Sequence, residues 1–150
     1  DKDFIYGDET KNQLAYLLQN GVIDSIPINF QTVSDWEDES QSLEDRARAY
    51  LAINCGHCHT PSGVANSTGL YLNFNEVRPL HLGINKSPVA TGRGSGNLNY
   101  SIVPGKAHES ILLFRMISTD PGVMMPESGR SLVHVEATNL IEEWINSMDN

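Results

Sequence analysis

Apolar side chains recur at helical spacing in four stretches of the chain, which therefore predict four helices. The clearest stripe predicts a helix over about residues 134–148 and consists of Ala137, Ile141, Trp144, Ile145 and Met148. A second stripe predicts a helix from Ser42, a good N-cap, to residue 54 and consists of Leu43, Ala47, Tyr50, Leu51 and Asn54. Weaker patterns predict helices over residues 8–20, capped by Asp8 or Thr10, and over about residues 107–118.

Residues 60–106 lie between the predicted helices and are rich in glycine, proline, serine and asparagine. Residues 70–72 (Leu-Tyr-Leu) are the best strand candidate, and the glycine-dense stretch 91–97 lacks the Lys-Ser/Thr of a phosphate-binding loop. A connection of this length fits a compact domain if it wraps a large ligand that replaces part of the core. The sequence therefore predicts an all-α fold with long loops, with a main domain over residues 42–150. An N-terminal helical extension over residues 1–41 is expected to pack on this domain or to be tethered to it.

The chain of 150 residues is long enough for one domain and short for two. Its net charge is −9, and residues 1–50 carry 11 of the 19 acidic and 4 of the 10 basic side chains. This balance argues against nucleic acid and anionic membrane surfaces as partners, and it serves either solubility or the steering of a partner with a basic docking patch. The longest aliphatic run, residues 111–114, is too short to span a membrane. The start of the chain lacks the basic and apolar parts of a signal peptide, so we expect a mature chain or an excised domain.

Both cysteines of the chain lie in one five-residue stretch, Cys55-Gly-His-Cys58-His59. Cysteines at i and i+3 on a helical turn point the same way, so two sulfurs can reach the two vinyl groups at one edge of a porphyrin. The next residue, His59, then lies beneath the ring, where its imidazole can bind the iron. This is the spacing of c-type haem attachment, so we expect one covalent haem c on Cys55 and Cys58, with His59 as an axial ligand of the iron. His57 points away from the iron and is interpreted as a spacer.

Two other chemistries fit part of this motif. Cys-Gly-His-Cys is also the active-site tetrad of protein disulfide isomerases, which leaves a thiol–disulfide oxidoreductase using Cys55 and Cys58 as an alternative function. In those enzymes the tetrad follows an apolar strand ending in Trp, whereas here it follows the polar helical segment 45–50. A zinc site would need a second pair of cysteines or two histidines with three to five residues between them, and the sequence has neither.

From Ser42 onward the chain resembles a class I c-type cytochrome, especially the single-haem domains with an enlarged middle loop found in secreted or periplasmic bacterial proteins. The features that carry the resemblance are the helix entering the Cys-x-x-Cys-His motif, Pro104-Gly105 before a helix with Arg115, the dipeptide Met125-Pro126, and a closing amphipathic helix with Trp144. The resemblance implies the class I cytochrome c fold around a haem, with the helices over residues 42–54 and 134–148 packed across each other.

The resemblance also implies that a methionine before the last helix is the second axial ligand of the iron. Met125 matches the family's Met-Pro pattern, and a residue before proline is pushed toward extended backbone, which suits a loop that presents a sulfur. Met124 is its rival, and either methionine can instead pack against the haem edge. His81 is the candidate for a bis-histidine alternative. Arg115, with Arg93 as an alternative, is the candidate partner of a haem propionate, because a guanidinium can hold a carboxylate in a bidentate way.

Two protein ligands leave the iron without an open site, which favours single-electron transfer by a carrier or by an electron-transfer domain of a larger secreted protein, rather than an enzyme. A haem sensor or peroxidase with an open sixth site is a further alternative. We expect a monomer that meets a redox protein in a weak, salt-sensitive contact. Because bacteria attach c-type haem outside the cytoplasmic membrane, the domain is expected to be periplasmic or secreted.

Overall fold

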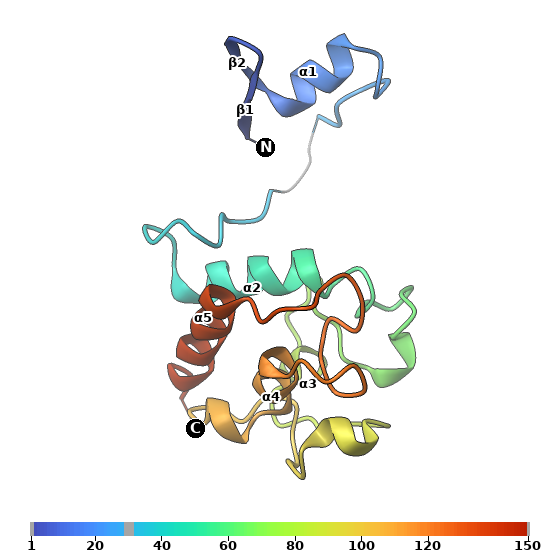
Figure 1. The fold of residues 1–150 in the computed structure, drawn as a ribbon, viewed down its shortest axis with the longest axis vertical. Helices are drawn as coiled ribbons and strands as arrows, with labels where there is room; N and C mark the ends of the chain where they lie inside the picture. The colour runs from blue at the N-terminus through green and yellow to red at the C-terminus, as the bar shows by residue number, and fades with distance from the viewer. Residues whose placement is uncertain (1, 29–31, 150) are drawn as a thin grey trace. The chain divides into compact units, whose positions relative to one another are not determined.

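The computed structural model describes residues 2–28 and 32–149, and the chain forms two compact units, residues 1–33 and 34–150 (Figure 1). The domain boundary predicted after residue 41 stays a prediction, since contacts show where the chain is compact and not which segments fold alone.

The first unit is a β-hairpin followed by a short helix. β1 (Asp3–Tyr6) pairs antiparallel with β2 (Glu9–Asn12), and Tyr6 lies opposite Glu9, so Gly7 and Asp8 form a two-residue turn. The φ of Gly7 is +65°, a conformation that glycine adopts without steric cost and that two-residue hairpin turns require. α1 (Gln13–Gln19) then begins after Asn12, whose side chain accepts a hydrogen bond from the Ala15 N–H at 3.1 Å.

The helix predicted over residues 8–20 is therefore wrong at its start, where Asp8 lies in the turn and Thr10 in β2. Aromatic and β-branched residues precede a Gly-Asp pair, which is a hairpin signal that outweighs the weak helical periodicity of this segment. The hairpin packs locally: the ring of Tyr6 stacks on that of Tyr16 in α1, with 3.7 Å between their centroids.

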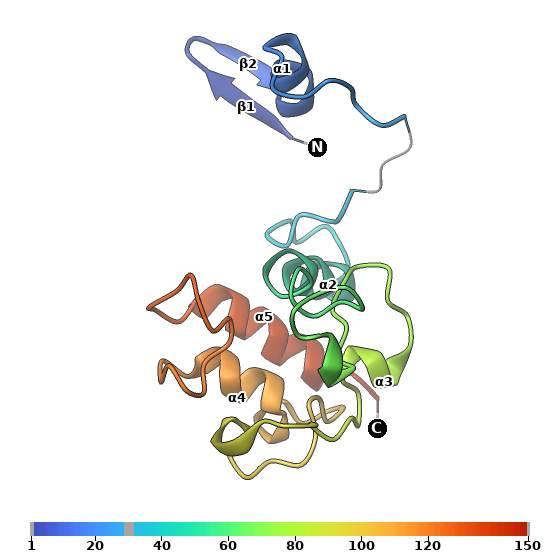
Figure 2. The same cartoon turned by 90° about the vertical axis from the view of Figure 1, so that its right-hand side faces the viewer.

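The second unit is organised around α2 (Leu43–Asn54) and α5 (Val135–Asn146). The Ser42 side chain accepts a hydrogen bond from the Asp45 N–H at 3.0 Å, which confirms the predicted N-cap. α5 lies beside both α2 and α4 (Ile111–Ile117), as two views of the ribbon show (Figures 1 and 2). α4 follows the short 3-10 turn η3 (Ala107–Glu109), so the predicted helix over residues 107–118 is present with a break at Ser110.

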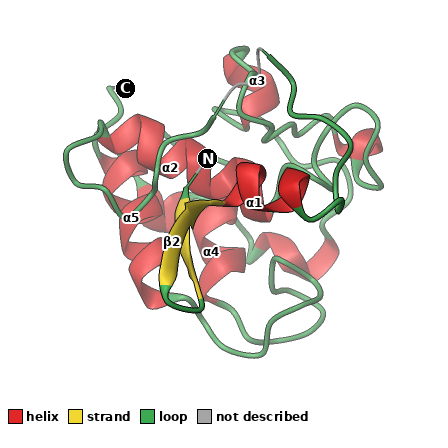
Figure 3. Cartoon of the chain, turned by 90° about the horizontal axis from the view of Figure 1, so that it is seen from above, coloured by secondary structure: helices red, strands yellow, loops and turns green. Residues whose placement is uncertain are grey.

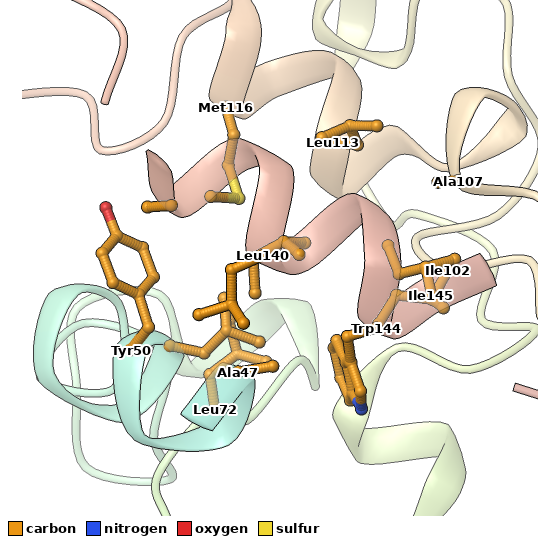
Figure 4. Packing of buried hydrophobic residues seen from close by; sticks show 13 residues of the cluster. Ala47, Tyr50, Leu72, Ile102, Ala107, Leu113, Met116, Leu140, Trp144 and Ile145 are labelled. Atoms are coloured by element: carbon orange, nitrogen blue, oxygen red, sulfur yellow. The ribbon is translucent and has the colours of Figure 1, made fainter. Parts of the chain in front are cut away.

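The helices meet in a cluster of buried apolar side chains (Figure 4). Its most deeply buried members are Ala47, Leu51, Leu72, Ile102, Ala107, Leu113, Ala137, Ile141, Trp144 and Ile145. Ala47 of α2 and Trp144 of α5 both belong to this cluster, which agrees with the predicted packing of the two helices. Leu72 and Ile102 come from the long middle segment, so this segment also contributes to the core.

Residues 60–106 contain three short elements, η1 (Asn66–Thr68), α3 (Pro79–Leu82) and η2 (Gly92–Ser95), and are otherwise irregular, as the sequence predicts. The strand proposed at residues 70–72 is absent. α3 was missed, although proline at its first position and Gly83 at its end are helix start and stop signals.

The prediction of an all-α, class I cytochrome c fold with a helical N-terminal extension is wrong. The described residues contain a two-stranded antiparallel sheet besides their α-helices, so the fold is mixed (Figure 3). Of these helices, α1, α3 and α4 have seven residues or fewer. Helical periodicity is a weak guide over such short segments, because helices of this length depend on tertiary packing.

Candidate functional site

The stretch from Cys55 to His59 begins where α2 ends. The Cys55 N–H donates to the Leu51 carbonyl at 2.8 Å, and the Cys55 carbonyl accepts from the N–H groups of Cys58 and His59 at 3.1 and 2.9 Å. These bonds wind the motif into a tight turn, which packs so closely against Gly63 that a Cβ there would collide with the Cys58 carbonyl. The turn keeps the two thiols, which are not joined by a disulfide, and the imidazole together at the end of α2.

Burial sets the protonation of this turn. It raises the pKa of the Cys55 thiol to about 12, because the thiolate would lose its hydration. It also lowers the pKa of His59, and the charge of Arg115 acts in the same direction, while the Leu70 carbonyl opposes them. That carbonyl does not reach hydrogen-bonding geometry, and the buried Nδ1 of His59 makes no hydrogen bond within the described residues. The imidazole is therefore neutral at pH 7, which is the form that binds metals.

A cavity of about 950 Å³ opens over the turn. Cys55, Cys58 and His59 line it together with Arg115 of α4 and Met125 of the following loop. Its apolar lining includes Leu70, Leu72, Leu82, Ile102, Ile111 and Leu112. The volume lies near the upper end of the roughly 300–1,000 Å³ that is usual for small-molecule sites, so the cavity suits a large, mainly apolar ligand.

Met125 is held at the cavity by the end of α4. Its N–H donates to the Arg115 carbonyl at 3.0 Å, and the Arg115 Nε donates to the Val123 carbonyl at 2.8 Å. The neighbouring Met124 is buried and does not line the cavity. Of the two candidate methionines, Met125 is thus the one that shares the cavity with His59.

Two other candidates lie away from the cavity. His81 sits in α3, with its Nδ1 3.2 Å from a carboxylate oxygen of Glu76 and its ring edge-on to that of Tyr71. Arg93 pairs with Asp120 at 2.8 Å. Neither His81 nor Arg93 lines the cavity, so the structure does not bring them together with the cysteine motif.

Two cationic residues that were not predicted from the sequence, Lys86 and Arg130, also line the cavity. With Arg115 they bring three cationic groups to the lining, against the carboxylate of Glu127, which gives this lining a net charge of +2 in a chain of net charge −9. Arg115 packs closely on Gly94, where a Cβ would lie 3.2 Å from the guanidinium carbon. Arg130 could have been found because it lies in the same loop as the predicted methionine ligand, whereas no local signal marks Lys86.

No protein-family model, no curated protein and no solved structure matches this chain. Among residues 2–28 and 32–149, no group of three or more His, Cys, Asp or Glu side chains is arranged to hold a metal ion. Together with the mixed fold, these findings overturn the assignment to the class I c-type cytochromes. The sequence motifs behind that assignment are each only a few residues long, and a set of short motifs in a given order does not define a fold. In the same part of the chain, no helix combines the length and the apolar character needed to cross a membrane.

Proposed function

We propose that the chain holds one haem covalently through Cys55 and Cys58, with His59 and Met125 as axial ligands of the iron, and that it transfers single electrons. The observation that supports this proposal is that these four side chains line one cavity, although Met125 lies 66 residues beyond His59. The proposal depends on these side chains and not on membership of a family.

The residues of the cavity fit a haem in three respects. The volume is large and the lining mainly apolar, as a porphyrin face requires. The lining carries a net charge of +2, which complements the two propionates of a haem, since buried carboxylates need cationic partners. Burial lowers the pKa of His59, so its imidazole is in the neutral form that binds metals.

The chain's own residues would have distinct roles around this group. A bound haem iron supplies one-electron redox chemistry. His59, neutral through burial, offers an imidazole nitrogen, and Met125 offers a soft thioether that favours Fe(II) and raises the reduction potential relative to a second histidine. Arg115 and Arg130 offset the charge of the propionates inside the cavity.

The alternatives are less well supported by the same residues. A thiol–disulfide oxidoreductase needs a reactive thiolate, and burial raises the pKa of Cys55 to about 12. A sensor or peroxidase needs an open sixth site, and Met125 lines the cavity together with His59. An electron carrier requires neither feature.

The proposal extends to the setting of the reaction. We propose a redox protein as the partner, meeting the chain in a weak contact that ionic strength weakens further, because the net charge of −9 favours a partner with a basic patch. We also propose a periplasmic or secreted location, because bacteria complete c-type haem attachment outside the cytoplasmic membrane.

The deciding experiment is the absorption spectrum of the purified protein, produced in a host that attaches c-type haem. We expect a strong Soret band from one haem per chain, and this haem should stay with the protein in acid–acetone. In Cys55→Ala/Cys58→Ala, the extracted protein should lose the colour. His57→Ala, which changes a residue between the cysteines, is the matched control and should keep it. A colourless wild-type protein with two titratable thiols would refute the proposal.

A further inference from the structure

Arg130 donates hydrogen bonds to three backbone carbonyls, two at the end of α4 and one in its own loop. Its Nη2 donates to the carbonyls of Arg115 at 3.1 Å and Ser118 at 2.7 Å, and its Nη1 donates to the carbonyl of Leu132 at 3.2 Å. The last carbonyls of a helix have no partner within the helix, and a cation that donates to them both satisfies them and complements the helix dipole. The guanidinium therefore ties the loop after Met125 to the end of α4.

Arg130 and the backbone of Met125 share one hydrogen-bond acceptor, the carbonyl oxygen of Arg115. The Arg115 carbonyl accepts from the Met125 N–H at 3.0 Å and from Arg130 Nη2. Met125 thus lies in a loop whose two sides are both fixed to α4, one by its own N–H and the other by Arg130. Arg130 lines the cavity together with Met125, and its Nε is buried and makes no hydrogen bond within the described residues.

We propose that Arg130 is a positioning residue for the axial methionine: its guanidinium fixes the loop that carries Met125, and so keeps the sulfur directed at the haem. This inference rests on the proposed function. Arginine is needed because one planar group donates to three carbonyls that belong to two segments, which a lysine ammonium on a flexible stem matches poorly. Without the guanidinium, the loop is free to move away and the sulfur is displaced more easily.

The test measures how easily an external ligand displaces the sulfur. Imidazole is titrated into the ferric, haem-containing protein, and its binding is followed by the shift of the Soret band. We expect imidazole to bind at least about tenfold more tightly to Arg130→Gln than to the wild type, because hydrogen bonds from a charged donor are lost. Arg130→Lys should lie between the two. Arg93→Gln removes a cation bonded to Asp120, in the turn before Met124, and is the matched control that should bind imidazole as the wild type does.

Each outcome separates the inference from the proposed function. A methionine sulfur bound to ferric haem iron gives a weak far-red absorption band. A wild-type protein with covalent haem but without this band refutes the axial methionine, and the inference fails with it. If the wild-type protein has that band and Arg130→Gln binds imidazole with the same affinity as the wild type, the inference alone is refuted. If Arg130→Gln does not fold, Arg130→Lys decides: unchanged affinity and an undiminished band in this variant overturn the proposal.

Discussion

Arg48 provides a sharp test of how the long middle segment is held against α2. Its side chain is buried, and Nη2 donates to three carbonyls, those of Asn73 at 3.4 Å, Phe74 at 2.9 Å and Glu76 at 2.6 Å. The segment that it holds follows Leu72, which lines the cavity and whose N–H donates to the His59 carbonyl at 2.8 Å. Replacing Arg48 with methionine keeps most of the side-chain volume and removes all three hydrogen bonds.

The expected cost follows from the geometry. The bonds to Phe74 and Glu76 are short and the bond to Asn73 is near the limit of hydrogen bonding, so two strong bonds are lost. A hydrogen bond from a charged donor is worth about 1.5–3 kcal/mol, and relief from burying the charge offsets part of the loss. We expect Arg48→Met to lower the free energy of unfolding by about 3 kcal/mol, which is roughly 6–12 °C in melting temperature for a chain of this size.

The assay is urea unfolding of the purified protein, followed by far-UV circular dichroism, with Arg46→Met as the matched control. Arg46 lies on the same helix and donates one hydrogen bond, from Nε to the Trp36 carbonyl at 2.9 Å. Its replacement should cost about 1.5 kcal/mol, the lower end of the same range, because Arg46 is only partly buried. If Arg48→Met costs no more than Arg46→Met, the three carbonyls are not held by Arg48 and the reasoning is refuted.

Three further predictions concern the two methionines, two glycines and Glu76. Met125→Ala should abolish the far-red band that the methionine sulfur gives with ferric haem iron. Met124→Ala should retain this band but lower the free energy of unfolding by about 2–5 kcal/mol, because Met124 is buried outside the cavity. The reverse pattern would contradict the ligand assignment. Gly96→Ala should lower the free energy of unfolding in urea by about 1–3 kcal/mol more than Gly92→Ala does. Both glycines have positive φ, but only a Cβ at Gly96 would clash, at 2.7 Å from the Phe114 ring of α4. Equal losses in the two variants would exclude this clash. The pKa of Glu76 is lowered, chiefly by hydrogen bonds from the neighbouring arginine, so its contribution to stability is present above the ordinary value of 4.5 and is lost as the pH falls below it. Urea unfolding from about pH 3 to pH 7 should therefore show a weaker pH dependence in Glu76→Gln than in the wild type, and identical slopes would rule out this role.

The sequence predicts best the elements that carry their own local signals. Ser42 caps α2 through its hydroxyl, and the apolar stripe of α5 corresponds to side chains that are buried in the core. The β-hairpin was missed although Gly7-Asp8 is a turn signal, because the apolar residues around it also fit a short helix.

The hydrogen bonds that hold the loop with Met125 at the cavity are the part that the sequence could not predict. Arg130 holds the loop through backbone carbonyls, and a carbonyl is present at every residue, so no sequence pattern reveals which of them are bonded. Likewise, Met124 and Met125 differ by one position, and only the path of the chain decides which one reaches the cavity and which one is buried.

The pairing of α2 with α5 imposes an order of events on the newly made chain. About eighty residues separate the end of α2 from the start of α5, which is roughly 4–16 s of synthesis at 5–20 residues per second. Until α5 is present, the core cluster against which Cys55 packs is incomplete. In the folded domain, burial raises the pKa of Cys55 to about 12 and makes the sulfur a poor nucleophile. Covalent chemistry at this cysteine is therefore favoured while the domain is still unfolded, and closure of the core slows it.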